Sequence, residues 1–230
     1  MKKSTDQRAT QELYTQLAEA YARLVQQEVQ VPQHYAKGES IFREGETPQG
    51  VYFIQAGWVK VYTLDENGNE AVLRLASKNE FIGYVSLLKQ WRFHASAVAI
   101  TKAEVHFIPK RVFLELLQSD VKFANLVVQM LCDELTQSEQ QIGDLLFKNV
   151  RQRLATFLLG LEQASGFDTQ HDDYRIRLPK KEIARVLGIS PETLSRHLSK
   201  LTDKGLISLA KNYIKLLDKK RLLRISKLKD

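Results

Sequence analysis

Between residues 38 and 59, glycine recurs at positions 38, 45, 50 and 57, with short apolar runs between the glycines. Glycine reaches positive φ and permits close backbone packing, so this spacing predicts tight turns between short strands. Runs rich in β-branched and aromatic residues continue to residue 108, and the run 59–64 alternates with period two before the turn Asn67-Gly68. The pattern predicts a compact antiparallel barrel or jelly roll. Strands are expected over residues 40–42, 50–55, 58–64, 70–76, 95–99 and 103–108.

A long helix is predicted from residue 120 to residue 148, after a shorter one over 110–117. Apolar or small residues recur in it at alternating spacings of three and four, which is typical of a coiled-coil seam between parallel helices. Its neighbours Leu126, Val127 and Leu146 could instead pack the helix against its own β-domain, and both packings can hold at once. We expect a homodimer. The seam residues are Val121, Ala124, Val128, Leu131, Leu135, Ser138, Ile142 and Leu145.

Residues 180–200 are predicted to form two short helices joined by a tight turn at Gly188. Ser190 is a good N-cap for the second helix, and Pro191 suits its first position. Leucines at positions 194, 198 and 201 share one face of that helix, so the opposite face is polar and free. Two helices joined in this way form the helix-turn-helix pattern, whose second helix enters the major groove of DNA.

The excess positive charge is confined to the last quarter of the chain. Residues 174–230 hold 16 Lys/Arg against 5 Asp/Glu, a balance of +11, whereas the whole chain carries +7. A cationic module joined to a near-neutral one predicts a polyanion such as nucleic acid as the partner. The one cysteine, Cys132, excludes an intrachain disulfide and is expected to be a small buried apolar side chain. With no apolar run of ~20 residues and no apolar signal segment, we expect a cytoplasmic protein without membrane contact.

The β-region, long helix and helix-turn-helix occur in the order seen in the CRP/FNR family of bacterial transcription regulators, which the chain resembles from about residue 38 to residue 217. The glycine-spaced stretch is similar to the family's cyclic-nucleotide-binding β-roll, and residues 181–198 to its recognition unit. The resemblance implies an α+β protein with an N-terminal antiparallel β-roll (jelly roll), a long dimerisation helix and a C-terminal winged helix-turn-helix. The expected domains are residues 1–119 (effector-sensing β-roll with N-terminal helices over 5–27), 120–148 (dimerisation helix, followed by a hinge at Asn149) and 149–230 (winged helix-turn-helix, wing strands 205–209 and 213–217).

The resemblance also implies DNA contacts. The family reads base edges with a Glu and an Arg four residues apart, here Glu192 and Arg196, and the intervening Ser195 is typical of the FNR branch, which implies a palindrome of the form TTGAT-N4-ATCAA. Arg suits bidentate contact with guanine, and Glu accepts from the cytosine amine. The alternatives are a capping carboxylate for Glu192 and a phosphate contact for Arg196, and His197 is expected to be a partly buried structural residue. Phosphate contacts, which position the protein without reading sequence, are expected from Lys180, Ser190, Thr193, Lys200 and Lys211.

The residues that the family uses to bind cyclic AMP are altered in this chain. The family's Gly-Glu-Leu turn, whose Glu holds the ribose, is Gly83-Tyr84-Val85 here, and its phosphate-binding Arg-Ser pair is His94-Ala95. An anionic phosphate thus loses its bidentate partner and a hydroxyl donor, so we expect no cyclic AMP and either another effector or none. The candidate effector pocket is Tyr84, Val85, Ser86, His94, Ser96 and Ser138.

The expected activity is that of a homodimeric, sequence-specific regulator of transcription that binds double-stranded DNA. Resemblance implies that it acts as an activator touching RNA polymerase, and the chain lacks the cysteine cluster of the family's iron–sulfur sensors. No catalytic motif or metal site stands out, so we expect no enzyme. Two alternatives stay open: a regulatory subunit whose winged helix binds a protein, and a haem-dependent gas or redox sensor. The candidate haem ligands are His34, His94, His106 and Cys132.

Overall fold

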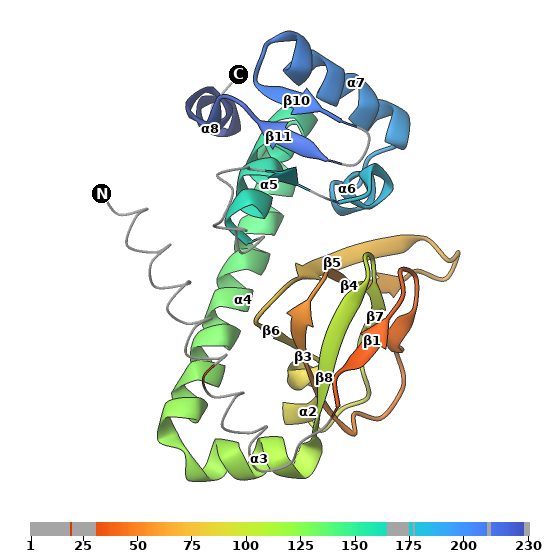
Figure 1. Cartoon of the computed structure of the whole chain (residues 1–230), viewed down its shortest axis with the longest axis vertical. Helices are drawn as coiled ribbons and strands as arrows, with labels where there is room; N and C mark the ends of the chain where they lie inside the picture. Colours follow the sequence, from red (N-terminus) through yellow and green to blue (C-terminus); the bar gives the residue numbers. More distant parts are fainter. Residues whose placement is uncertain (1–18, 20–30, 165–174, 177, 211–212, 228–230) are drawn as a thin grey trace. The chain divides into compact units, whose positions relative to one another are not determined.

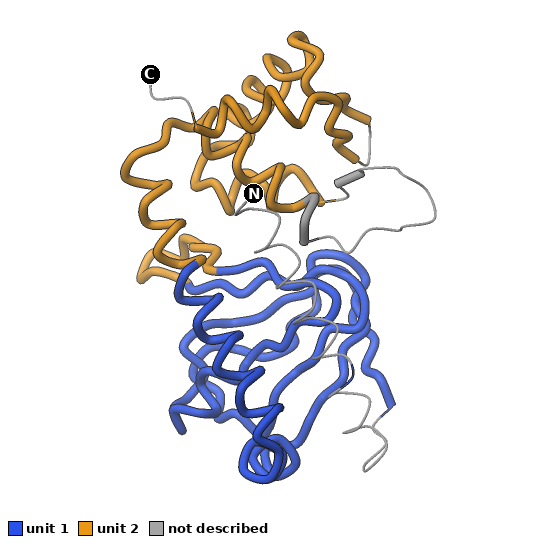
Figure 2. The backbone as a smooth tube through the Cα atoms, turned by 90° about the vertical axis from the view of Figure 1, so that its left-hand side faces the viewer, with its two compact units in different colours: residues 1–63, 74–136 blue, residues 64–73, 137–230 orange. Residues whose placement is uncertain are grey.

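The computed structural model describes residues 19, 31–164, 175–176, 178–210 and 213–227. The helices expected over residues 5–27 and the wing turn with Lys211 lie outside this part of the chain. The chain divides into two compact units, coloured separately in Figure 2. The first consists of Met1–Thr63 and Arg74–Thr136, and the second of Leu64–Leu73 and Gln137–Asp230.

Two four-stranded sheets make up the β-roll (Figure 1). One has the order β1 (Gln33–Tyr35), β8 (Ala103–Pro109), β3 (Gly50–Ala56) and β6 (Glu80–Ile82). The other has the order β2 (Ser40–Phe42), β7 (Ser96–Ala99), β4 (Val59–Leu64) and β5 (Glu70–Ala76). The pairs β1–β8, β3–β8, β3–β6, β2–β7 and β4–β7 are antiparallel.

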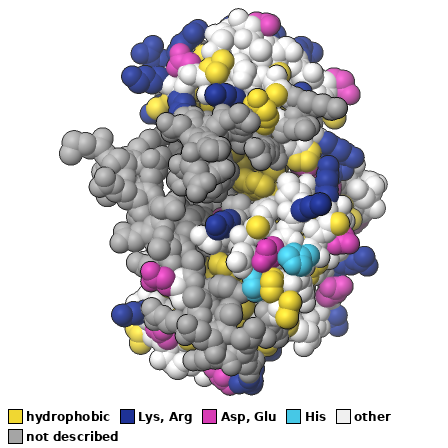
Figure 3. Space-filling view, in the orientation of Figure 1, with side chains coloured by type: hydrophobic (Ala, Val, Ile, Leu, Met, Phe, Trp, Pro, Cys, Tyr) yellow, Lys and Arg dark blue, Asp and Glu magenta, His cyan; other side chains and the backbone are white. Residues whose placement is uncertain are grey.

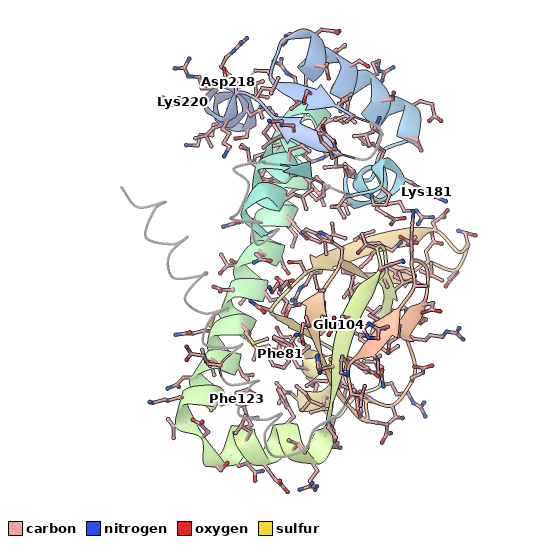
Figure 4. All side chains as sticks on the ribbon, in the orientation of Figure 1. Phe81, Glu104, Phe123, Lys181, Asp218 and Lys220 are labelled. Carbon is pink, nitrogen blue, oxygen red and sulfur yellow. The ribbon has the colours of Figure 1, made fainter. Side chains whose placement is uncertain are left out.

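Strand β3 is buried on both faces because it lies between two apolar cores. Val51 and Phe53 belong to a core shared with the helices, whereas Ile54 belongs to the core between the sheets, with Tyr52 packed against it. Successive side chains of a strand point to opposite faces, which explains this division. Figure 4 labels two members of the first core, Phe81 of β6 and Phe123 of the long helix.

The spaced glycines serve the two purposes predicted for them. Gly38, Gly45 and Gly57 have φ values of 92°, 84° and 90°, in the left-handed region that L side chains rarely adopt. Gly50 lies so close to the backbone carbonyl of Ile108 on β8 that a Cβ atom would overlap it. These positions therefore require glycine for turn geometry or for close strand packing.

Three helices complete the first unit: α2 (Tyr84–Leu88), α3 (Lys110–Ser119) and the first part of α4 (Val121–Phe147). Asp120 caps α4, since its carboxylate accepts from the amides of Lys122 (2.8 Å) and Phe123 (3.2 Å). One face of α4 is buried in the core shared with the sheet and α3. It carries Phe123, Leu126, Val127 and Met130.

The second unit carries the helix-turn-helix, α6 (Lys180–Val186) and α7 (Pro191–Asp203). Strands β10 (Ile207–Leu209), β11 (Ile214–Leu216) and β9 (Arg175–Ile176) form a small sheet in the order β10-β11-β9. Helix α5 (Val150–Ala164) packs against the terminal helix α8 (Lys219–Lys227).

The predicted α+β architecture of β-roll, long helix and winged helix-turn-helix is confirmed. The strands and helices predicted within the described residues are present with ends shifted by up to three residues, and β1, β6, β9, α2 and α8 were not predicted. Expected burial is wrong at Cys132, which is exposed. Of the three residues that could pack α4 against the β-domain, Leu126 and Val127 are buried and Leu146 is 70% exposed. Within the described residues, no helix has the length and apolar content needed to cross a membrane.

Candidate DNA interface and effector region

Helix α7 begins as its sequence predicts. The Ser190 hydroxyl accepts a hydrogen bond from the Thr193 amide at 3.1 Å, and Pro191 occupies the first turn, where no amide proton is needed. The preceding Gly188 has a φ of 62°, which lets the chain reverse between α6 and α7. Leu194, Leu198 and Leu201 are buried, so the orientation of α7 about its own axis is set by these three side chains.

The opposite face of α7 is exposed and polar. Glu192, Ser195 and Arg196, the predicted base-reading residues, are all exposed and lie within one turn of the helix. A helix in the major groove can present such side chains to base edges only if they project from the face opposite its core contacts. The structure therefore brings the three together on the free face.

Two ionisable groups on α7 have shifted pKa values. Hydrogen bonds from its own backbone amide and from Ser190 lower the pKa of Glu192, so this carboxylate is ionised and available as an acceptor. Burial, followed by the positive charges of Lys200, Arg196 and Arg151, lowers the pKa of His197. His197 is half-buried, as predicted, and is neutral at physiological pH.

Four of the predicted phosphate-contacting residues lie on or next to α6 and α7. Lys180 at the start of α6 and Lys200 near the end of α7 are exposed, while Ser190 and Thr193 sit at the α7 N-terminus. Backbone amides and the helix dipole make such a terminus favourable for a phosphate group. Lys211 lies outside the described residues.

The junction between α4 and α5 is held by a reciprocal cap. The Gln152 amide donates to the Asn149 side chain at 3.0 Å, and the Asn149 amide donates to the Gln152 side chain at 2.7 Å. Arg153, which was not predicted as functional, donates to the Lys148 carbonyl (3.2 Å) and to the Leu187 carbonyl (3.4 Å) at the end of α6. Its guanidinium therefore connects the end of α4 to the turn of the helix-turn-helix.

The effector region contains a buried polar network that was not predicted. The Tyr84 hydroxyl donates to the Glu134 carboxylate, and Arg74 of β5 pairs with the same carboxylate at 3.1 Å. Arg74 also lies 3.9 Å from Glu80 and donates to the Phe81 carbonyl at 3.3 Å. The network links β5, α2 and α4 within the first unit.

Two members of this network, Tyr84 and Arg74, have raised pKa values. Burial and the negative charge of Glu134 raise the pKa of the Tyr84 phenol, so Tyr84 remains a proton donor. Burial alone would lower the pKa of Arg74, but the carboxylates of Glu80 and Glu134 outweigh it and raise that pKa. The guanidinium of Arg74 is therefore charged and the phenol of Tyr84 is neutral.

Four of the remaining pocket candidates make contacts within the first unit. The Ser86 hydroxyl lies 2.9 Å from Nδ1 of the exposed His94, and Ser96 accepts from the Glu44 amide at 3.0 Å. Val85 packs against the core beside the helices. Ser138 lies on α4 in the second unit and is exposed.

The side chains at the family's nucleotide-binding positions differ in chemistry from a carboxylate and an arginine. The ribose-binding carboxylate of the family is replaced by a phenol that is 1% exposed and hydrogen-bonded to Glu134. The phosphate-binding arginine is replaced by His94, which cannot form a bidentate contact. The partly buried cation of the region, Arg74, already pairs with carboxylates.

Loss of the Glu134 carboxylate is expected to destabilise the first unit. Glu134→Ala leaves the Arg74 guanidinium and the Tyr84 hydroxyl short of an acceptor, which should lower the free energy of unfolding by about 1–3 kcal/mol. The matched control is Glu139→Ala, an exposed carboxylate on the same helix, expected to change it by less than about 0.5 kcal/mol. Urea denaturation followed by fluorescence measures both, and equal losses would show that the network contributes no stability.

The candidate haem ligands lie on separate segments of the first unit. Nε2 of the buried His106 is hydrogen-bonded to Gln55, His94 contacts Ser86, and His34 and Cys132 are exposed on β1 and α4. In the described part of the chain, no three His, Cys, Asp or Glu side chains form a cluster that could hold a metal ion.

A second face of α4 is apolar yet exposed. The predicted seam residues lie on it, and Leu135, Ile142 and Leu145 are each about 60% exposed (61%, 59% and 61%). Their burial is not required by the fold of the single chain, because the core face of α4 is a different one. The exposed seam side chains are Val121, Val128, Leu131, Leu135, Ile142 and Leu145.

Comparisons with known proteins agree with both parts of the molecule. The Cyclic nucleotide-binding domain family matches residues 32–120, and the Crp-like helix-turn-helix domain family matches residues 152–225. The cAMP-activated global transcriptional regulator CRP of Salmonella typhimurium is 30% identical over 175 residues, covering 76% of this chain and 83% of that protein. Electron transport regulator A of Shewanella oneidensis is 28% identical over 185 residues, covering 79% and 73%. The structure of FixK2 from Bradyrhizobium japonicum aligns with a TM-score of 0.75 at 24% identity, over 87% of this chain and 100% of that one.

The fold and the exposed face of α7 define a winged-helix DNA-binding protein that carries a cyclic-nucleotide-binding type of β-roll. The chain belongs to the CRP/FNR family of transcription regulators. Its regulation of transcription through DNA binding follows from that membership.

Proposed function

We propose that the protein is a cytoplasmic homodimer that binds a TTGAT-N4-ATCAA-like palindrome in double-stranded DNA. It has no catalytic activity. The observation that carries this proposal is the exposed grouping of Glu192, Ser195 and Arg196 on a helix whose other face is locked into the core. Arg196 would contact guanine and Glu192 the cytosine amine. Lys180, Ser190, Thr193, Lys200 and Lys211 would hold phosphates and set the depth of α7 in the groove.

The dimer is supported by the exposed apolar face of α4. Six seam side chains at heptad spacing would be buried between two parallel copies of this helix. Burial of such a face is favourable by about 25 cal/mol for each Å² removed from water. A two-fold dimer places two α7 helices on successive major grooves, one helical turn apart, which requires a palindromic site.

Regulation is proposed to use an effector other than cyclic AMP, or none. The Tyr84–Glu134–Arg74 network supports this, because a hydrogen bond and an ion pair between the protein's own side chains join the β-roll to α4. Contact with RNA polymerase and activation of transcription are proposed by analogy with the family. Among the described residues, no contact of the candidate ligands His34, His94, His106 and Cys132 favours haem.

A gel shift with dialysed, nucleotide-free protein tests the proposal. We expect tight binding to the palindrome, and at least about tenfold weaker binding when five base pairs are inserted at its centre, because the half-sites then face opposite sides of the duplex. Added cyclic AMP should leave the dissociation constant unchanged and release no heat in calorimetry. Equal affinity for both spacings would contradict the palindrome, and tighter binding with cyclic AMP would contradict the effector proposal.

A further inference from the structure

Helix α8 presents a row of positive charge that the base-reading surface does not use. It contains five Lys/Arg and no Asp/Glu among its nine residues. Leu222, Ile225 and Ser226 are buried, and α8 packs against α5 through this side. Asp218 caps the helix, since its carboxylate accepts from the Arg221 amide at 2.9 Å. The helix is thus anchored by one face, and its cations occupy the other.

The exposed cations form a continuous stripe. Lys220, Arg224 and Lys227 follow at spacings of four and three, which aligns them on one side of the helix, and Arg221 is exposed beside them. Figure 4 labels Lys220 at the outer edge of α8, and Figure 3 shows lysine and arginine side chains projecting in the region where Figure 1 places α8. We call Lys220, Arg221, Arg224 and Lys227 together the α8 basic row.

Helix stability does not account for the row. Cations near a helix C-terminus interact favourably with the dipole, which would explain Arg224 and Lys227. Arg221 lies 4.0 Å from the Asp218 carboxylate, which offsets its charge in part. Lys220 lies in the first turn, where the dipole disfavours positive charge, and like charges three or four residues apart repel by about 0.2–0.5 kcal/mol. An anionic partner would offset this repulsion.

We propose that the α8 basic row binds the phosphate backbone of the duplex held by α7, without reading its sequence. Charge complementarity selects this partner, because the row lies in the cationic helix-turn-helix module and offers exposed lysine and arginine side chains, both of which bind phosphate oxygens. Lys220 and Lys227 are seven residues apart, so the row spans about 10 Å along the helix. That length matches about three phosphates of one strand, which lie about 3.4 Å apart along the duplex axis.

Salt dependence of binding tests the row, in full-length protein on a duplex with long flanks. The variant K220Q/R221Q/R224Q/K227Q should reduce the slope of log affinity against log salt by about 0.9 for each phosphate that is no longer neutralised, which is roughly 2–3 for each protomer and about twice that for the dimer. Affinity should fall equally on the palindrome and on random DNA, because phosphate contacts carry no sequence information. The milder variant K220Q/R224Q should give about half the change, which guards against misfolding of the fourfold variant.

The matched control neutralises four exposed lysines of the first unit, K37Q/K78Q/K102Q/K110Q, and should leave the slope unchanged. The inference rests on DNA binding by α7, and the same titration separates the two. Absence of DNA binding in the wild type would overturn both. Wild-type binding with an unchanged slope in both α8 variants would overturn only the role of the row.

Discussion

Replacing Leu135 with glutamate is expected to separate the dimer and to weaken binding to the palindrome by at least about 100-fold. Leu135 is 61% exposed in the single chain, so the substitution leaves the fold of the monomer intact. In a parallel seam the two copies of residue 135 face each other, and burying two like charges there costs several kcal/mol. A 100-fold decrease in affinity corresponds to about 2.7 kcal/mol. Sedimentation velocity and gel shifts measure the two effects.

The control for this variant is Gln140→Glu, which adds the same charge to an exposed position of α4 outside the seam. It should sediment as a dimer and bind DNA as the wild type does. If Leu135→Glu also remains dimeric with unchanged affinity, the exposed apolar face of α4 is not the dimer interface.

Replacing Arg196 with alanine is expected to cost about 1–3 kcal/mol per half-site and to relax discrimination at one base pair. The side chain is exposed on the free face of α7, so its removal should not alter the helix. Bidentate contact between Arg and guanine provides this discrimination, and the effect of removing it should appear only on DNA that contains the guanine. Gel shifts with the palindrome and with each single-base variant measure the pattern.

Lys200→Ala is the comparison, because Lys200 is exposed on the same helix and is assigned to a phosphate. It should weaken all sequences alike and lower the salt slope by about 0.9 for each half-site. If Arg196→Ala instead weakens specific and random DNA equally, Arg196 contacts a phosphate, and the assignment of guanine reading is wrong.

The DNA-binding unit could be predicted closely because its determinants are local. Ser190 caps α7, Gly188 turns the chain before it, and three leucines form the buried face, all within 14 residues of sequence. Capping, turn geometry and helical periodicity act over a few residues, so they can be interpreted without tertiary contacts. Helix α8 was missed because the preceding wing strand suggested no continuation, although Asp218 before two lysines is a capping signal.

The polar network of the effector region could not be predicted, because its members are far apart in the sequence. The substitution to Tyr84 argued against cyclic AMP, but nothing near it pointed to Glu134, which is 50 residues away in the chain. Arg74 lay in a strand whose alternation gave no sign that its side chain would meet two carboxylates. Long-range pairing of this kind depends on how β5, α2 and α4 pack.

The sequence by itself determined the order of the modules, the turns that require glycine and the polar face of α7, because periodicity and backbone restrictions act locally. Only the tertiary structure decided which side of α4 is core and which is exposed. The apolar pattern of α4 covers more than one face, and packing of Phe123, Leu126, Val127 and Met130 against the β-roll leaves the seam in solvent. The same packing brings Tyr84, Glu134 and Arg74 together. A phenol or a cation that is removed from water is destabilising unless it is hydrogen-bonded or paired, and Glu134 provides that partner for both.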